Sequence, residues 1–192
     1  MWDVPFGTSF TMKASIMLMA LLLLATSISP VHSSEQASEP SAQLSLPKSK
    51  EVSTSDVRVV ALQNVFKKYS SPLLPYSRLY VQYADIHGID WKLLPAISGI
   101  ESTFGRRHVE GTHNVYGWGG GYIYFKDWED GIEHISRSLK EKYIERGADT
   151  IYKIGPIYAP PSKTWAWKVT YFANEINREY IELTSKNQTL TL

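Results

Sequence analysis

The stretch Leu93–Gly105, which reads LLPAISGIESTFG, decides the fold class because it joins an apolar helical stripe to a single carboxylate. Its stripe consists of Leu93, Leu94, Ile97 and Ile100. Spacings of three and four residues are typical of an amphipathic helix, and Asp90 before the stretch is a good N-cap. The pattern predicts a helix over residues 90–104 that is stopped by Gly105.

Glu101 directly follows the last apolar position of this helix, so we expect it at the edge of the buried face. A partly desolvated carboxyl group has a raised pKa, which lets it hold a proton near neutral pH and act as a general acid. The alternative is a solvated surface residue, because most glutamates in proteins are exposed. The residues that follow favour the first interpretation.

The segment from Gly105 to Phe125 is rich in glycine and in aromatic residues. Glycine lets the backbone approach a ligand closely, while tyrosine and tryptophan offer flat faces and polar edges that suit a sugar. We expect this segment to line a groove beside Glu101, as a Gly/aromatic loop or as a small β-hairpin within residues 115–125. Its candidate sugar-binding residues are Tyr116, Trp118, Tyr122 and Tyr124.

Three motifs carry a resemblance to a known family. Pro95–Gly105 resembles the catalytic-helix motif of the lysozyme-like superfamily, which includes soluble lytic transglycosylases and the glucosaminidase domains of bacterial autolysins (glycoside hydrolase family 73). Asn114–Gly117 is similar to the Asn-x-Phe-Gly segment of those glucosaminidases. Ile157–Pro161, followed by Trp165, is similar to their late Tyr-Ala segment. The order of the motifs also matches, and the resemblance covers about residues 56–183.

This resemblance implies a mainly α, lysozyme-like fold and an endo-β-N-acetylglucosaminidase type of activity on the β-1,4 bonds of peptidoglycan glycan strands. Glu101 would protonate the glycosidic oxygen, Tyr158 would line the active site, and Asn114 would belong to the substrate-binding segment. The chain departs from those enzymes because it has no clear hairpin with a second acidic residue. Glu110, the only other carboxylate in residues 105–125, is the candidate for positioning water, and a solvated loop residue is the alternative.

Two other functions stay open. A lytic transglycosylase of the same superfamily uses one glutamate as acid and then as base, and it leaves a 1,6-anhydro sugar. A non-catalytic glycan-binding module would keep the groove without turnover. Analysis of the products released from purified cell wall separates the three.

The N-terminal part carries an expected export signal. Residues 1–33 contain a basic start at Met12–Lys13, which is a second candidate start of the chain, then an apolar run and a small-residue exit typical of a signal peptide. The apolar run, Ala14–Ile28, is shorter than the roughly 20 residues that a membrane-spanning helix needs, so cleavage is favoured over an uncleaved anchor. We therefore expect a secreted, periplasmic or wall-associated protein.

The rest of the chain divides into a linker, one domain and a tail. Residues 34–55 have a polar, linker-like composition and are expected to be disordered. Residues 56–183 are enough for one core, and residues 184–192 form a tail. Periodicity and capping residues predict helices over residues 56–69, 75–86, 90–104, 127–147 and 148–154, and from Ser162 to about residue 180.

In the last of these helices, Trp165, Phe172 and Tyr180 share one face and are expected in the core, whereas Trp167 has no assigned role.

The composition of the chain argues against several other classes of protein. Its 20 Lys and Arg against 19 Asp and Glu leave a net charge of +1 without a basic stripe, so nucleic acid is not an expected partner. There is no cysteine, and no histidine pair has the spacing of a zinc peptidase, so we expect no disulfide, metal or cofactor.

Overall fold

The computed structural model describes residues 52–189, and this part of the chain is mainly α-helical, as the sequence predicts. Within residues 52–189 there are six α-helices and no β-strand. The helices are α1 (Val57–Lys68), α2 (Ser77–His87), α3 (Leu93–Ser102), α4 (Trp128–Lys142), α5 (Ile151–Tyr158) and α6 (Trp165–Thr189). Short 3₁₀ helices lie between them at Leu74–Tyr76, Trp118–Gly121 and Ile144–Arg146.

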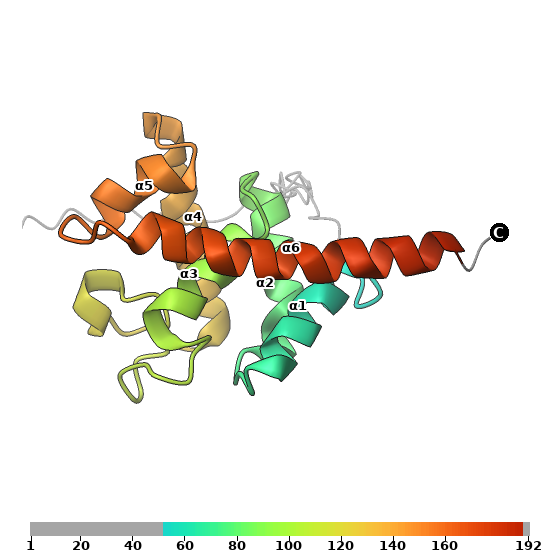
Figure 1. Ribbon diagram of the computed structural model, residues 1–192. Helices are drawn as coiled ribbons and strands as arrows, with labels where there is room; N and C mark the ends of the chain where they lie inside the picture. Colours follow the sequence, from blue (N-terminus) through green and yellow to red (C-terminus); the bar gives the residue numbers. More distant parts are fainter. Residues whose placement is uncertain (1–51, 190–192) are drawn as a thin grey trace, which may run out of the picture. The chain divides into compact units, whose positions relative to one another are not determined.

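Helix α6 is the element against which most of the others pack. It contacts α1, α3 and α5, while α2 packs against α4. Figure 1 shows α6 lying across α3 and α1, with its C-terminal turns extending beyond α1. The inward face of α6 consists of Trp165, Val169, Ala173 and Ile176, all of them buried. These positions recur at three- and four-residue steps, which explains why one face of this long helix is apolar.

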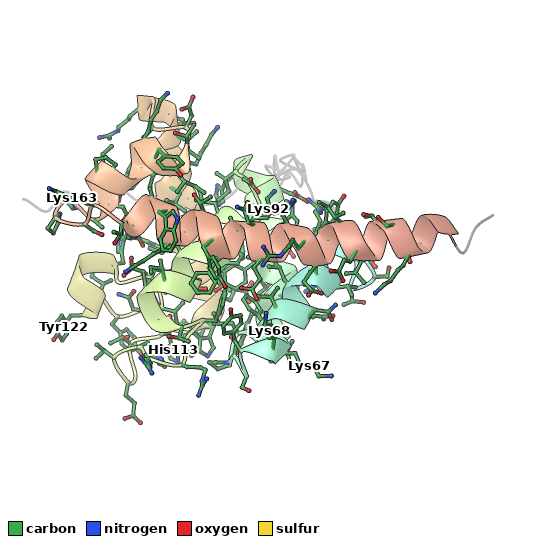
Figure 2. All side chains as sticks on the ribbon, in the orientation of Figure 1. Lys67, Lys68, Lys92, His113, Tyr122 and Lys163 are labelled. Atoms are coloured by element: carbon green, nitrogen blue, oxygen red, sulfur yellow. The ribbon has the colours of Figure 1, made fainter. Side chains whose placement is uncertain are left out.

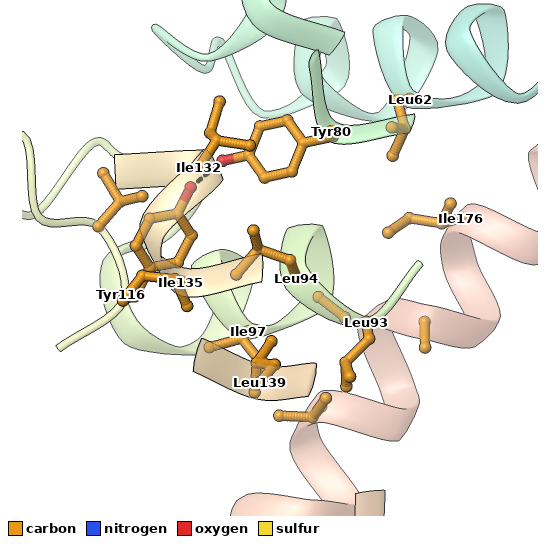
Figure 3. Packing of buried hydrophobic residues seen from close by; sticks show 14 of the residues in the cluster. Leu62, Tyr80, Leu93, Leu94, Ile97, Tyr116, Ile132, Ile135, Leu139 and Ile176 are labelled. Carbon is orange, nitrogen blue, oxygen red and sulfur yellow. Dashed lines mark hydrogen bonds between the residues drawn. The ribbon is translucent and has the colours of Figure 1, made fainter. Parts of the chain in front are cut away.

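Helix α3 lies at the centre of the core. All residues from Leu93 to Gly99 are buried, and Figure 3 shows side chains of α3 meeting those of α1, α2, α4 and α6. Side chains in a close-packed core have little freedom to move. The C-terminal end of α3, which carries Glu101, is therefore held in a fixed position.

Side-chain caps begin two of the helices, and the sequence predicts the second of them, Asp127. The side chain of Asp56 accepts a hydrogen bond from the Arg58 amide at 2.8 Å and caps α1. Asp127 accepts from the Asp130 amide at 2.8 Å and caps α4. Gly88, with a φ of 61°, ends α2 as predicted, because glycine adopts the left-handed conformation without strain.

The start of α3 differs from the prediction. Asp90 does not cap this helix: its carboxylate accepts from the Lys92 amide at 3.0 Å within a separate turn, and α3 begins only at Leu93. Pro95 consequently falls in the first turn, where its missing N–H breaks no helix hydrogen bond.

The predicted bounds of the helices near residue 150 are also wrong. Helix α5 begins later than predicted, after the Thr150 cap, and continues through Pro156 to Tyr158. Proline removes one helix hydrogen bond, but this helix runs on for two residues beyond Pro156. Helix α6 begins at Trp165 and not directly after Ser162.

The N-terminal predictions are only partly covered by the described residues. Val52, in the segment assigned to a linker, is buried in the core, with 8% of its surface exposed. The signal peptide and the linker up to residue 51 lie outside the described residues. No helix within residues 52–189 is long and apolar enough to cross a membrane.

Candidate active site

Glu101 lies in the last turn of α3, where the chain turns sharply. Thr103 and Phe104 both have a φ of 53°, and their amides donate to carbonyls of the last turn at 3.1 and 3.0 Å. A β-branched residue such as threonine rarely adopts this conformation, which costs on the order of 1–3 kcal/mol. The fully buried ring of Phe104 offsets that cost by packing against Phe66 and Phe172. The helix therefore ends at Ser102, before the predicted stop at Gly105.

Ser102 joins this helix end to the Gly/aromatic segment. Its hydroxyl oxygen lies 2.8 Å from the Val115 carbonyl oxygen and accepts a hydrogen bond from the Gly105 amide at 2.9 Å. A buried hydroxyl with both partners in place fixes the local geometry. Residues 114–118 are thereby held against the helix turn that carries Glu101.

The Glu101 carboxyl group is partly buried and has one strong hydrogen-bond partner. The indole Nε1–H of Trp165 donates to its Oε1 at 2.7 Å. Burial raises the pKa of Glu101 above its ordinary value, and the hydrogen bond from Trp165 acts in the opposite direction. The sequence-based expectation of a partly desolvated carboxyl with a raised pKa agrees with this geometry.

Gly117 lets the loop backbone come close to the second oxygen of Glu101. A Cβ atom built on Gly117 would lie only 2.7 Å from Glu101 Oε2. The φ of Gly117 is +65°, a conformation that residues with a side chain rarely adopt. Both the conformation and the close approach therefore favour glycine at position 117.

An aromatic cluster lies next to the carboxylate. The Tyr158 ring stacks on Trp165 with a centroid distance of 5.0 Å, and it lies 5.8 Å from the Trp118 ring and 6.0 Å from the Tyr143 ring. The Tyr158 hydroxyl donates to the Tyr116 carbonyl oxygen at 2.6 Å. Burial, and then the nearby Glu101 charge, raises the pKa of Tyr158 well above its usual range. Tyr158 and Trp118 thus belong to the surroundings of Glu101.

Tyr116, in contrast, is a core residue. Its side chain is 1% exposed, and its hydroxyl lies 2.9 Å from that of Tyr80 on α2, as the dashed line in Figure 3 shows. A sugar cannot reach a ring that is enclosed by the core. This corrects the assignment of Tyr116 to sugar binding: its contribution to the site is the backbone carbonyl that receives the Tyr158 hydroxyl.

Asn114 shapes the loop and does not face solvent. It is 2% exposed; its amide nitrogen donates to the carbonyls of Trp118 and Ile123 at 2.8 and 3.1 Å, and its Oδ1 accepts from the Trp118 amide at 3.1 Å. Because its amide group is hydrogen-bonded inside the loop, Asn114 has no free surface for a sugar. This corrects the assignment of Asn114 to substrate binding. Its hydrogen bonds hold the loop closed.

The hairpin alternative for this segment is wrong. Residues 115–125 form a loop with a 3₁₀ turn at Trp118–Gly121, and four of its glycines have positive φ values between 58° and 88°. These values coil the chain and are incompatible with an extended strand. The Gly/aromatic loop, the other predicted form, is the one observed.

The three remaining candidates lie at the surface, and one of them, Tyr124, is 68% exposed. Tyr122 is 78% exposed, and Figure 2 shows it projecting outward from the loop. Glu110 is also exposed and forms no hydrogen bond or ion pair with the residues that the structure describes. Nothing in this geometry assigns any of these three side chains a fixed position relative to Glu101.

Sequence reasoning missed the part that Trp165 plays in the site. The helical spacing placed it in the core, and its 3% exposure confirms that position. However, the N–H of a buried indole needs an acceptor, and Glu101 supplies it. This requirement could have been used with the sequence alone: a core tryptophan next to the Tyr-Ala segment predicts a hydrogen-bond acceptor close to its indole N–H.

No protein-family model matches the chain, and a search of curated proteins finds no significantly similar relative. Within residues 52–189 no three His, Asp or Glu side chains come together in a way that could hold a metal ion. The groups that the site offers for chemistry are one carboxyl of raised pKa, an indole N–H and several aromatic faces.

Proposed function

We propose that this protein is a glycosidase of the lysozyme-like superfamily that cleaves β-1,4 bonds in the glycan strands of peptidoglycan. The observation that carries the proposal is Glu101, whose partly buried carboxyl has a raised pKa and lies between a glycine backbone and an aromatic cluster. A proton donor beside flat aromatic surfaces suits acid-assisted cleavage of a sugar chain. The three sequence motifs supply the class of substrate.

In the proposed reaction, Glu101 protonates the glycosidic oxygen while the bond to the anomeric carbon breaks and an oxocarbenium-like centre forms. Because Oε1 accepts from Trp165, Oε2 is the oxygen left to carry the proton. Oε2 faces the backbone of Gly117, whose lack of a side chain leaves room for the carboxyl group. Trp165 would thus act as a positioning residue that orients the carboxyl, and Trp118 and Tyr158 would contact the sugar.

The exposed, unpartnered Glu110 favours a scheme with a single protein carboxylate. In such a scheme the substrate's own N-acetyl group assists, and either water or a sugar hydroxyl completes the reaction. Attack by water gives an endo-β-N-acetylglucosaminidase, whereas attack by the sugar's own hydroxyl gives a lytic transglycosylase with a 1,6-anhydro product. The second activity is therefore the alternative proposal.

The decisive variant is Glu101→Gln, because glutamine keeps the size and the acceptor oxygen for Trp165 but cannot protonate the leaving oxygen. Release of soluble fragments from purified peptidoglycan should fall by roughly a hundred- to ten-thousand-fold, the usual contribution of general acid catalysis. Glu110→Gln is the matched control and should retain near-normal activity. A folded Glu101→Gln protein with wild-type activity would refute the assignment.

Mass spectrometry of the released fragments distinguishes the candidate functions. Reducing ends indicate hydrolysis, and 1,6-anhydro ends indicate a transglycosylase. Binding to insoluble peptidoglycan with no soluble product from the wild-type protein would instead favour the non-catalytic glycan-binding module.

Export of the protein, which this substrate requires, is part of the same proposal. N-terminal sequencing of secreted material should find a start near Ser33 to Ser38.

A further inference from the structure

A second aromatic surface lies between α3 and α6, outside the contacts described for Glu101. It is a hollow of about 270 Å³ lined by Ile100, Trp167, Lys168, Tyr171 and Phe172. Trp167 is 64% exposed and Tyr171 is 52% exposed, although large aromatic side chains are usually well buried. Large apolar groups gathered around a hollow at a protein surface often mark a binding site.

The aromatic side chains around the hollow are held in place by the helix and by packing. Trp167 and Tyr171 are four residues apart on α6, so their rings lie on one helix face about 6 Å apart along the axis. The floor is held in place, since the Phe172 ring packs against Phe104 at 5.0 Å and against Tyr171 at 5.4 Å. A preformed aromatic surface loses little conformational freedom when a ligand binds.

The hollow and the carboxylate use the same two helices, but neither Glu101 nor Trp165 lines the hollow. Ile100 directly precedes Glu101 on α3, and Trp167 comes two residues after Trp165 on α6. Successive residues of a helix are turned by about 100°, so Trp167 points away from the direction in which Trp165 reaches Glu101. The hollow is thus close to the proposed cleavage site in the fold but separate from it.

We propose that Trp167 and Tyr171 form an accessory sugar-binding platform that holds a stretch of cell-wall glycan outside the cleavage site. Each sugar ring has an apolar face that can stack on an aromatic ring, and two rings spaced along a helix suit two sugars of one chain. Lys168 at the rim is exposed and forms no ion pair with any residue of the described part, which leaves it available to a carboxylate of the cell wall. The identity of this ligand rests on the proposed function.

The test is binding of the full chain to purified, insoluble peptidoglycan, measured by sedimentation in a Glu101→Gln background so that the glycan stays intact. Replacing both Trp167 and Tyr171 with alanine should weaken binding about tenfold, which corresponds to about 1.4 kcal/mol. Replacing both with phenylalanine keeps two flat rings and should restore most of the affinity. Tyr152→Ala is the matched control, because Tyr152 is an equally exposed aromatic residue on α5, at 65%.

The outcomes separate this inference from the proposed function. Weaker binding by the double-alanine variant, with the Tyr152→Ala protein unaffected, supports the platform. Equal binding by all variants overturns it, even if the protein with an intact Glu101 releases soluble fragments. If no fragments are released while binding still depends on Trp167 and Tyr171, the proposed cleavage is overturned and the platform stands. Circular dichroism of each variant establishes that the fold is intact.

Discussion

At the scale of single residues, the tightest constraint on the site is the glycine that faces the proposed acid. A side chain at position 117 would need a positive φ and would place its Cβ atom 2.7 Å from Glu101 Oε2. The atom that it meets is the far end of a flexible side chain, so the carboxylate would move before the backbone does. A change at Gly117 should therefore affect chemistry more than it affects folding.

Gly117→Ala is predicted to lower the rate of peptidoglycan cleavage at least about tenfold, because displacing a reacting group by a fraction of an ångström has large effects on catalysis. The matched control is Gly111→Ala in the same segment, where φ is +77° and no atom lies within 4 Å of the added Cβ. Both variants should lose about 1–2 kcal/mol of stability from the left-handed conformation. Equal activity of the two variants would contradict the proposed position of the acid.

The same residues show how far the sequence could predict the site. Glu101 could be predicted from the sequence because helix periodicity and a motif both indicate it. Tyr116 was misassigned because an aromatic residue in a glycine-rich segment looks like a surface residue, whereas the turn folds its ring back against Tyr80. Which way a loop side chain points depends on the φ values of the neighbouring glycines, and local sequence patterns do not determine these values.

At the scale of elements, α1 and α6 are joined by a buried carboxylate. Glu175 on α6 is 4% exposed, and it accepts hydrogen bonds from Lys68 Nζ at 2.6 Å and from the Tyr69 hydroxyl at 2.8 Å. Figure 2 shows Lys68 beside α6. A buried charge is costly unless its partners are in place, so each of these hydrogen bonds should contribute to the packing of the two helices.

Tyr69→Phe tests this contact because it removes one hydroxyl group and keeps the ring. The free energy of unfolding should fall by about 1.5–3 kcal/mol, the usual range for a hydrogen bond to a charged group, and urea denaturation measures it. Tyr152→Phe removes a hydroxyl from an exposed ring and should change stability little. A loss no larger than that of this control would mean that Lys68 alone satisfies Glu175.

The elements themselves were predicted with uneven success, for physical reasons. The cap at Asp127 and the stop at Gly88 are local features, so a few neighbouring residues determine them. The bounds of α5 depend on packing: Ile154 and Gly155 are buried in contact with α6, and this contact stabilises the helix through Pro156. Contacts between distant segments are not visible in a local pattern, which is why Tyr158 was placed in a loop.

At the scale of the whole molecule, the raised pKa of Glu101 connects the proposed activity to folding stability. Burial raises the pKa in the folded protein, while an unfolded glutamate keeps a pKa of about 4.3. The folded state therefore binds more protons between these two pKa values. The contribution of Glu101 to the free energy of unfolding is fully present below the pKa of the unfolded state. It is lost as the pH rises through the pKa of the folded state. This group should thus leave the fold less stable at neutral pH than at a pH below the unfolded pKa.

Glu101→Gln should consequently be more stable than the wild type at neutral pH, since glutamine occupies the same partly buried position without a charge and still accepts the Trp165 hydrogen bond. The difference in the free energy of unfolding should shrink as the pH is lowered towards the unfolded pKa, because the wild-type carboxyl is then protonated in the folded and in the unfolded state alike. Denaturant titrations at a series of pH values measure it, with the exposed Glu110→Gln as the control that should show no such trend. A Glu101→Gln protein that is less stable than the wild type at neutral pH would mean that the ionised carboxylate stabilises the fold, and the assignment of Glu101 as a protonated acid would then be wrong.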